Sequence, residues 1–262
     1  MQYTTLKYDK DGRVGQVSFS RPEIHNAFNG TVITEMSHLF GELAKDDDLR
    51  VILLTGEGKS FCAGADLNWM REVVHQSLAQ NLAESNALAE LFYQIYTFKH
   101  PVVGRINGAA IGGGTGFVAV CDIAIAARSA MFSFSEVKIG VVPACIGPYV
   151  IRKMGEGKAR ELFITGERMS AERAFEVGLV NKVVDDDQLD FEVEKLIQSI
   201  LTSGPEAVSM AKKLISEVPM MPPSEFKPFT AEMIARLRVS AEGQEGMDAF
   251  LNKRKPRWVS EK

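Results

Sequence analysis

Short apolar runs alternate with segments of helical periodicity along most of the first 185 residues, and this alternation limits the fold more than any other feature. Residues 14–20 follow the turn "DKDG" and predict a strand, and residues 50–56 predict a second, buried strand. Between them, apolar residues recur at helical spacing over residues 29–45. Further elements follow in the same order: a helix over 81–98, a strand over 101–112, another helix, and a strand over 121–127. This order predicts an α/β fold with a mostly parallel sheet that is covered on both faces.

The pattern changes after the segment "GLVNKVVDDDQL", beyond which only helices are predicted. They cover residues 188–202, 205–218 and about 226–251, and the helix-breaking segment "VPMMPPSE" separates the last two. We therefore divide the chain into a core over residues 1–200 and a C-terminal helical region over residues 201–262.

Composition and charge exclude several classes of protein. Hydrophobic residues make up 45% of the 262 residues and charged residues 24%, which excludes a disordered or fibrous chain. The formal net charge is -4, and the only long basic block is "NKRKPR" near the end of the chain. We therefore expect no nucleic-acid partner.

Cysteine and histidine usage is typical of a reducing compartment. The three cysteines have no CxxC spacing and the four histidines have no metal-ligand spacing, so we expect neither a disulfide framework nor a metal site. The first residues lack the charged and apolar regions of a signal peptide, and no apolar stretch is long enough to span a bilayer. We expect a cytoplasmic protein that does not associate with a membrane.

Glycines interrupt the apolar segment "INGAAIGGGTGFVAVCDIAI", residues 106–125, although each costs roughly 0.5–1 kcal/mol inside a helix or strand. A dinucleotide fingerprint starting at Gly112 fails because Phe117 stands where its third glycine is required. The segment "GEGKS" ends like a phosphate-binding P-loop, but Leu53 stands where that motif needs its first glycine. Two interpretations remain. The glycines expose backbone N–H groups in a strand-to-helix turn at the positive end of a helix dipole, or they only permit close packing of the helix on the sheet.

A second turn of small residues favours the first interpretation. Residues 58–70, "GKSFCAGADLNWM", follow the strand "VILLTG" and place Ala63, Gly64 and Ala65 ahead of a predicted helix. Two turns at the ends of neighbouring parallel strands can each direct one N–H group at a single oxygen atom. Such a pair of donors stabilises negative charge that develops on oxygen, as when a thioester carbonyl becomes an enolate.

Six segments together resemble the enoyl-CoA hydratase/isomerase, or crotonase, family, in order and over nearly the whole chain. They are "RPEIHNAFN", "GEGKSFCAGADL", "NGAAIGGGTGF…CDIAIAA", "FSFSEVKIGVVP", "RELFITGERMSAERAFEVGLVNKVV" and "EGMDAFLNKRKPRW". The resemblance implies a crotonase-like spiral of ββα repeats, with residues 201–262 as a region that forms homotrimers or, by pairing of trimers, homohexamers. It also implies an acyl-CoA thioester substrate and no cofactor, because coenzyme A is part of the substrate.

The same resemblance assigns the site. It places an oxyanion hole on the backbone N–H groups of Ala65 and Gly113, and a proton-transferring carboxyl group on Glu136. The residues expected to bind the acyl-CoA are Ala27, Ala63, Gly64, Ala65, Asp66, Leu67, Gly113, Gly116, Phe250 and Lys253. Asp66 has an alternative role as the N-cap of the following helix, and "NKRKPR" has one as a solvated tail.

Family hydratases usually carry two catalytic glutamates, and this chain keeps one. Glu136 aligns with the second, whereas Gly116 stands at the position of the first. Hydration of a 2-enoyl thioester needs a base for the water at C3 and an acid for C2. Glu136 is therefore either the sole proton shuttle of a Δ3,Δ2-enoyl-CoA isomerase or the acid of a hydratase whose backbone groups, with a substrate carboxylate, hold the water. The apolar residues that flank Glu136 predict a raised pKa for its carboxyl group.

Two segments, "GADLNWM" and "SEVKIGVVPACIGPYV", are similar to a bacterial branch of methylglutaconyl-CoA hydratase-like members, which favours the hydratase. The substrate is then expected to be a branched or carboxylated 2-enoyl-CoA. An acyl-CoA-binding protein without catalysis is the alternative from another class. Retention of Glu136 and of both small-residue turns argues against that alternative.

Four further side chains keep two interpretations each. Trp69 and Met70 either bound the acyl chain or pack their helix, and Cys145 either lines the acyl pocket or is a small buried hydrophobe. His25 lies beside the strand that the resemblance places at the adenine site, although a structural role is favoured.

Overall fold

The strands form two sheets, in a computed structural model that describes residues 2–259. The strands are β1 (Leu6–Asp11), β2 (Val14–Phe19), β3 (Val51–Gly56), β4 (Ser60–Cys62), β5 (Val102–Ile106), β6 (Ala109–Ile111), β7 (Ile123–Ala127), β8 (Met131–Ser133), β9 (Arg168–Ser170) and β10 (Lys182–Val184). The larger sheet has the order β1-β2-β3-β5-β7-β10 and is parallel except for the pair β1 and β2. The smaller sheet has the order β4-β6-β8-β9, and only β8 and β9 are antiparallel.

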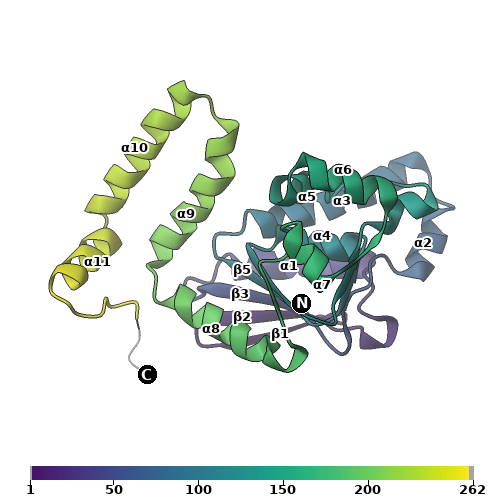
Figure 1. Ribbon diagram of the computed structural model, residues 1–262, viewed down its shortest axis with the longest axis horizontal. Coiled ribbons are helices and arrows are strands. Elements are labelled where there is room, and N and C mark those ends of the chain that lie inside the picture. The colour runs from purple at the N-terminus through teal and green to yellow at the C-terminus, as the bar shows by residue number, and fades with distance from the viewer. Residues whose placement is uncertain (1, 260–262) are drawn as a thin grey trace.

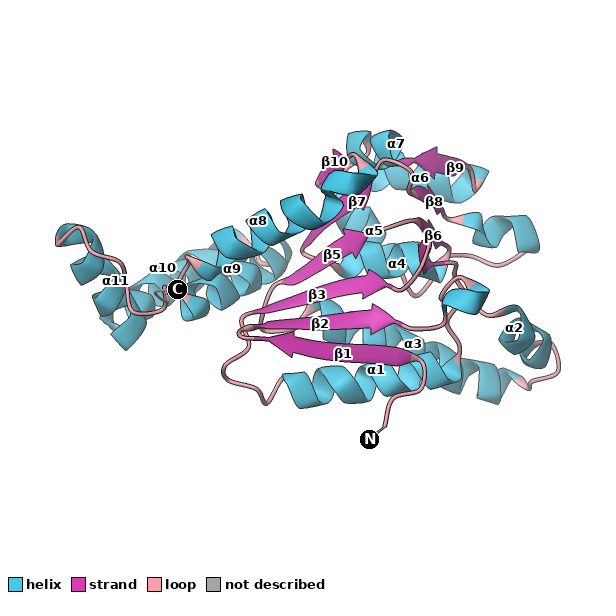
Figure 2. Cartoon of the chain, turned by 90° about the horizontal axis from the view of Figure 1, so that it is seen from below, coloured by secondary structure: helices cyan, strands magenta, loops and turns pink. Residues whose placement is uncertain are grey.

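Consecutive strands step from the larger sheet to the smaller one. The pairs β3–β4, β5–β6 and β7–β8 each place one strand in either sheet before the chain goes on to helix or 3-10 structure. The helices are α1 (Gly30–Leu43), α2 (Leu67–Val73), α3 (Leu78–Tyr96), α4 (Gly113–Val120), α5 (Gly147–Met154), α6 (Glu156–Thr165), α7 (Ala171–Glu176), α8 (Leu189–Leu201), α9 (Pro205–Glu217), α10 (Pro223–Val239) and α11 (Ala241–Leu251). The predicted α/β spiral of ββα repeats is confirmed, and Figure 2 shows the larger sheet with helices on both faces.

Both faces of the larger sheet are buried, as β3 illustrates. Val51 and Leu53 pack against α8, whose Leu189, Val193 and Ile197 are buried with them. The alternate residues of β3 face the main core, which is also formed by the apolar faces of α1, α3 and α4. Because successive strand residues point to opposite faces, a strand covered on both sides is apolar throughout, which is why residues 50–56 form an almost continuous apolar run.

The predicted strand over residues 101–112 is wrong in one respect, because it is two strands. β5 belongs to the larger sheet and β6 to the smaller one, and the segment Asn107–Gly108 turns the chain between them. A Cβ at Gly108 would lie 2.0 Å from the carbonyl oxygen of Lys59, so this crossing requires a glycine. The turn after residue 56 is likewise followed by a short second-sheet strand, β4, that the sequence pattern did not separate from β3.

The C-terminal helices extend away from the sheets, with α9 and α10 as an antiparallel pair and α11 beside α10 (Figure 1). The predicted helix over about 226–251 is divided, because Ser240 leaves the helical conformation and its Oγ accepts a hydrogen bond from the N–H of Gly243 at 3.1 Å to begin α11. The carboxylate of Glu242 in α11 accepts hydrogen bonds from the N–H groups of Glu206 and Ala207 at the start of α9. Within residues 2–259, no helix combines the length and apolarity that crossing a membrane requires.

Candidate active site

The first turn of the site follows β4 and consists of small residues. Gly64 has a φ of +93°, and a Cβ there would lie 2.7 Å from the carbonyl oxygen of Ile111, so the turn needs glycine for both its conformation and its space. The turn is fixed to residues 25–28, because Phe28 N–H donates to Gly64 O and Asp66 N–H donates to Phe28 O, both at 2.8 Å. Ala65 lies between these two bonds and is half-buried.

The second turn follows β6 and leads into α4. Gly112 has a φ of +53°, and Gly113 is the first residue of the helix. A Cβ on Gly113 would lie 2.7 Å from the ring of Phe28, and one on Gly114 would lie 2.0 Å from the carbonyl oxygen of Cys62. The glycine triplet therefore permits close packing against the first turn, so the packing interpretation holds for these positions whatever else they do.

The two turns are neighbours because β4 and β6 pair in parallel, with Ser60 opposite Ala109. Across residues 2–259, neither the N–H of Ala65 nor that of Gly113 donates to an acceptor within the chain. Gly113 stands at the N-terminus of α4, where helical N–H groups have no intrahelical partner and the helix dipole is positive. The structure thus brings two unpaired, half-buried donors to the same edge of the smaller sheet.

Glu136 lies beside the second turn. It belongs to a 3-10 helix, Ser135–Ile139, that follows β8, the strand next to β6. A Cβ on Gly112 would lie 3.3 Å from Oε1 of Glu136, which shows how closely the carboxyl group approaches the glycines. Oε2 is buried without a hydrogen-bond partner, and burial raises the pKa of this carboxyl group above its ordinary value, as predicted. A carboxyl group in this state can hold a proton nearer to neutral pH than a solvated one.

Apolar side chains fill the space beside Gly116, the position at which family hydratases usually carry their first catalytic glutamate. A Cβ on Gly116 would lie 2.1 Å from Cγ2 of Ile146 and 3.1 Å from Cζ of Phe92. Ile146 is the N-cap residue of α5 and is 2% exposed, so it has little room to withdraw. Gly116 is therefore required by the packing of α4 on α5, and no acidic side chain could stand at this position with Ile146 in place.

Asp66 is the N-cap of α2, as predicted. Its Oδ1 accepts a hydrogen bond from the N–H of Asn68 at 2.8 Å, and its Oδ2 accepts one from Nη2 of Arg21 at 2.8 Å. Burial raises the pKa of Asp66, but these hydrogen bonds outweigh it and lower the pKa below its ordinary value. Both carboxylate oxygens therefore have partners within the chain, which supports the capping role of Asp66 and leaves its predicted contact with acyl-CoA a prediction.

The other residues predicted to bind acyl-CoA fall into two groups. Ala27 and Ala63 adjoin the first turn, and Leu67, the first residue of α2, has an exposed side chain. Phe250 and Lys253 belong to α11 and the segment after it, which lie at the opposite end of the fold from α2 and α4 in both views (Figures 1 and 2). Within one copy of the chain, the structure does not bring these two residues to the turns.

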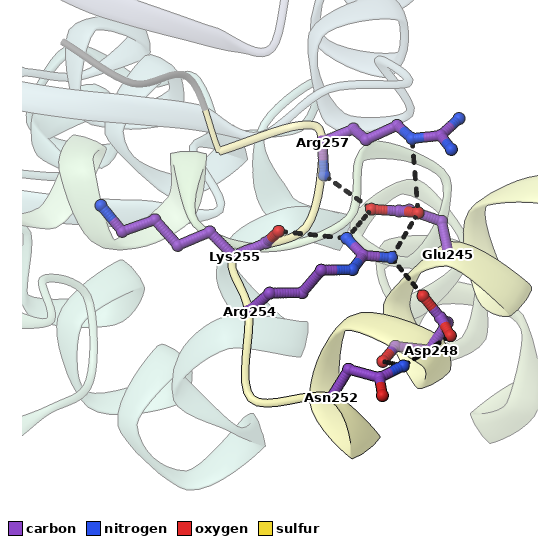
Figure 3. Close-up of polar contacts among 6 residues, drawn as sticks. All are labelled: Glu245, Asp248, Asn252, Arg254, Lys255 and Arg257. Atoms are coloured by element: carbon purple, nitrogen blue, oxygen red, sulfur yellow. Dashed lines mark hydrogen bonds and ion pairs between the residues drawn. The ribbon is translucent and has the colours of Figure 1, made fainter.

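The C-terminal basic segment is partly neutralised by acidic side chains of α11 (Figure 3). Arg254 donates to both carboxylate oxygens of Glu245, at 2.7 and 2.9 Å, and also contacts Asp248. Arg257 N–H donates to Glu245 as well, and the hydrogen bonds from Arg254 lower the pKa of Glu245 to about 2. Lys253 and Lys255 form no ion pair with another described residue. The segment is thus held in place with two free ammonium groups rather than being a wholly solvated tail.

Trp69 and its neighbours form one wall beside the turns. The indole ring lies 5.8 Å from the ring of Phe28, centroid to centroid, and its N–H donates to Glu84 at 3.0 Å.

Cys145 is half-buried, with Sγ 3.7 Å from the carbonyl oxygen of Ser85. His25 Nδ1 lies 3.0 Å from Oγ of Ser60, a local contact that agrees with its structural interpretation.

Sequence reasoning missed Arg21, Phe28 and Ile146. Phe28 lies under Gly113, Ile146 fills the space over Gly116, and Arg21 binds Asp66. The segment "RPEIHNAFN" contains two of the three, but a single sequence does not show which side chain meets which turn. Among residues 2–259, no three His, Cys, Asp or Glu side chains are grouped so that they could hold a metal ion.

The ββα spiral, with two neighbouring turns of small residues and a buried carboxyl group against the second of them, defines an enzyme of the crotonase class. Residues 9–261 match the family model for enoyl-CoA hydratase/isomerase, and the chain belongs to that family. It is 32% identical over 263 residues to a crotonyl-CoA hydratase of Syntrophomonas wolfei, covering 99% of this chain and 100% of that protein. A short-chain-enoyl-CoA hydratase of Clostridium acetobutylicum is 31% identical over 261 residues, with 97% of each protein covered.

Solved structures agree with this assignment. The crystal structure of an enoyl-CoA hydratase from Shewanella pealeana matches with a TM-score of 0.94 at 39% identity, and the match covers 98% of this chain and 97% of that one. An enoyl-CoA hydratase from Mycobacterium smegmatis matches with a TM-score of 0.93 at 32% identity, over 98% and 100% of the two chains. The resemblance seen in the sequence motifs is therefore confirmed at the level of family and fold.

Proposed function

We propose that the protein is an enoyl-CoA hydratase, which adds water across the double bond of a 2-enoyl-CoA thioester. The observation that carries the proposal is the Glu136 carboxyl group, which lies against the Gly112 turn with Oε2 buried and unpaired. Relatives that are named as crotonyl-CoA and short-chain-enoyl-CoA hydratases support the reaction type. No cofactor is required, because coenzyme A belongs to the substrate.

In the proposed mechanism the thioester oxygen accepts hydrogen bonds from the N–H groups of Ala65 and Gly113. As the oxygen of water bonds to C3, electron density moves onto the thioester oxygen, where the two donors stabilise it. Glu136 delivers its proton to C2 and then takes one proton from the added water, so that the carboxyl group ends in its starting state. The product is a 3-hydroxyacyl-CoA. A raised pKa favours the protonated carboxyl group that the first step needs.

A second candidate reaction has an observation in its favour. Gly116 offers no second acid, and Ile146 fills the space that one would take. A lone carboxyl group suffices to move a proton between C4 and C2, which is the reaction of a Δ3,Δ2-enoyl-CoA isomerase. The hydratase is preferred because the relatives are named for it.

Product analysis in heavy-oxygen water separates these reactions. The purified protein is incubated with a 2-enoyl-CoA and, separately, with a 3-enoyl-CoA, and the products are read by mass spectrometry. Solvent oxygen in a 3-hydroxyacyl product is expected and identifies a hydratase. A shifted double bond without solvent oxygen would identify an isomerase instead. Tight binding of both thioesters without any reaction would favour a non-catalytic acyl-CoA-binding protein.

We further propose a branched or carboxylated substrate of the methylglutaconyl-CoA type. With Ile146 where a second acid would stand, a carboxylate on the substrate supplies a second charged group that orients water together with backbone groups. We expect a kcat/KM at least about tenfold higher for a carboxylated, branched 2-enoyl-CoA than for a straight-chain one of equal length, a preference in the range that a few pocket contacts supply. Equal values would contradict this substrate class and leave the hydratase itself unaffected.

The proposed assembly is a homotrimer or a pair of trimers in the cytoplasm. Large apolar side chains of α9–α11 are exposed in the single chain: Ile215, Ile234, Val239, Met247, Phe250 and Leu251. An apolar cavity of about 450 Å³ also remains between α9 and the core, away from the glycine turns. A neighbouring copy would cover such surface and bring Phe250 and Lys253 to its site. Light scattering that finds only monomer at micromolar concentration would contradict the assembly.

The three cysteines, none of which is in a disulfide, suit the reducing compartment that we propose.

A further inference from the structure

Arg21 joins the turn that carries Ala65 to the neighbouring segment 25–28. Its Nη1 donates to the carbonyl oxygen of Ala27 at 2.7 Å, and its Nη2 donates to Oδ2 of Asp66 at 2.8 Å. One guanidinium group therefore binds the segment 25–28 and the turn 63–66 at the same time. Because the guanidinium is planar and rigid, it fixes the distance between these two attachment points.

The N–H of Ala65 belongs to the turn that Arg21 binds through the side chain of Asp66. Phe28 N–H donates to Gly64 O on one side, and Asp66 N–H donates to Phe28 O on the other. These bonds use the neighbours of Ala65 and leave its own N–H unpaired, as described above. The direction of that N–H is therefore set by how the turn lies against residues 25–28.

The segment 25–28 is not held by regular secondary structure. His25 and Asn26 both adopt left-handed backbone conformations, with φ of 55° and 58°, which are uncommon for residues other than glycine. Side-chain hydrogen bonds offset this strain, because Asn26 Oδ1 accepts from the N–H of Arg21 at 2.9 Å and Asn26 Nδ2 donates to Ser60 O at 2.7 Å. Arg21 thus contributes its guanidinium to two contacts and its backbone to three, because its carbonyl oxygen also accepts from the N–H groups of Ile24 and Asn26.

The ion pair between Arg21 and Asp66 is shielded from solvent. The side chains are 18% and 9% exposed, and the second oxygen of Asp66 accepts the capping bond from Asn68. Removing one member of such a pair leaves the other charge desolvated, and the surrounding backbone then shifts to recover solvent or another partner. The backbone nearest to Asp66 is the turn that carries Ala65.

We propose that Arg21 is a positioning residue of the reaction, which holds the Ala65 N–H where it can donate to the thioester oxygen. Arg21 does not touch the substrate. It acts through Ala27 and Asp66, and the inference rests on the proposed function because it takes Ala65 as an oxyanion donor. Substitution of Arg21 therefore weakens polarisation of the thioester carbonyl more than it weakens binding of the CoA ester.

The test uses Arg21→Ala, Arg21→Lys and Asp66→Asn in the full-length protein. Asp66→Asn is informative because its Oδ1 can still cap α2 while the charge that pairs with Arg21 is lost. Arg105→Ala is the matched control, since Arg105 pairs with Asp190 on the α8 face of the larger sheet. Removal of a whole oxyanion donor lowers kcat by about 10²–10³-fold, and displacement of one costs part of that. We expect kcat to fall about 10–10²-fold in Arg21→Ala, less in Arg21→Lys and Asp66→Asn, with KM changed less than about threefold.

The second readout is the infrared stretching frequency of butyryl-CoA labelled at the thioester carbonyl carbon. This ester has no double bond to hydrate, so it reports polarisation alone. Binding to the wild type should lower the frequency, and the shift should be smaller with each Arg21 or Asp66 variant but unchanged with Arg105→Ala. Added guanidinium ion should restore part of the kcat of Arg21→Ala, because the substitution leaves a site of that shape.

The outcomes separate this inference from the function on which it rests. If the wild type hydrates its substrate and lowers the carbonyl frequency, and the folded Arg21 variants match it in both kcat and frequency shift, Arg21 has no positioning role. If KM rises while kcat and the frequency shift both stay unchanged, Arg21 serves binding and the inference is also wrong. If the wild type itself shows no frequency shift, the assignment of the oxyanion donors fails instead.

Discussion

Helix α1 of the core buries seven of its 14 residues, whereas α9 and α10 of the C-terminal region bury none in the chain as described. α11 buries only Ala249. The core is held by apolar contacts in two clusters on either face of the larger sheet. The C-terminal helices are instead held to one another and to the core mainly by polar bonds.

Polar bonds of this kind lie both within the C-terminal region and between that region and the core. Glu242 caps α9, Arg254 ties the last segment to α11, and the indole N–H of Trp258 donates to the carbonyl oxygen of Thr202 at 3.0 Å. Arg13 of the β1–β2 turn donates to the carbonyl oxygen of Trp258 at 2.8 Å. Such bonds fix orientation but bury little apolar surface, so the core covers its own apolar side chains whereas the C-terminal helices leave large ones exposed in a single copy of the chain.

The largest expected effect concerns chemistry that belongs to the core alone. Glu136→Gln removes a carboxyl group that is buried and unpaired beside the Gly112 turn, and we expect kcat to fall about 10²–10⁴-fold. Binding of acyl-CoA and the oligomeric state should be nearly unchanged, because the substitution preserves shape. Steady-state kinetics measure the effect, with Glu167→Gln at an exposed position as the control. A variant with full kcat would remove Glu136 from the mechanism.

Removal of residues 241–262 tests the other side of the comparison. The deletion removes α11, the contacts of Arg254 with Glu245 that Figure 3 shows, and the Glu242 carboxylate that caps α9. We expect the trimer to be lost and affinity for CoA esters to fall with it, while the core keeps its far-ultraviolet circular dichroism per residue. Light scattering and calorimetric titration with a CoA ester measure the two losses. Retention of a trimer by the truncated chain would place the interface elsewhere.

Removal of the same side chain volume should have opposite consequences in the two regions. Leu54→Ala in β3, at a fully buried position, should lower the free energy of unfolding by about 2–5 kcal/mol because it leaves a cavity. Ile215 in α9 is 72% exposed. Ile215→Ala should lower the free energy of unfolding of the monomer by less than about 0.5 kcal/mol but weaken assembly. Urea unfolding of dilute protein and concentration-dependent light scattering separate the effects. Equal losses of monomer stability would contradict the comparison.

The packing of Ile146 on Gly116 can be measured as a coupling between two substitutions. Gly116→Ala places a Cβ 2.1 Å from Cγ2 of Ile146 and should cost about 1–3 kcal/mol by overpacking. Ile146→Ala removes that methyl group, so the double variant should be more stable than the sum of the single ones by about 0.5–3 kcal/mol. Additive losses would mean that Ile146 yields freely and that the site has room for a larger side chain.

The smallest expected effect is a pH dependence of stability. An unfolded glutamate releases its proton near its ordinary pKa of about 4.3, whereas burial keeps Glu136 protonated to higher pH in the folded chain. Between the two pKa values the folded state binds more protons, so this residue lowers stability as pH rises through the window, and its contribution then levels off. Glu136→Gln should lack this fall, while Glu167→Gln should show it in full. Urea midpoints measured across the window give the difference.

Local patterns were sufficient for much of the core. The helix over 29–45 and the strand over 14–20 were predicted within two residues of α1 and β2, because burial of one helix face or of a whole strand is visible in the spacing of apolar residues. The boundary between β5 and β6 was not visible, since both are apolar and a turn of Asn and Gly shifts the chain to another sheet without changing the pattern. The division of α10 from α11 was missed because Ser240 fits a helix as well as it fits a cap.

By itself, the sequence pattern determined the α/β class, the separate helical C-terminal region, the two small-residue turns and the apolar neighbours of Glu136, whereas the spiral of ββα repeats was implied by the family resemblance. Those features depend on residue type and on spacing within one segment, which the chain displays directly. Only the tertiary structure decided that Phe28 lies under Gly113, that Ile146 occupies the space above Gly116, and that Arg21 joins Ala27 to Asp66. Each of these contacts links segments that are distant in sequence, and its geometry is fixed by sheet register and helix packing rather than by any local preference.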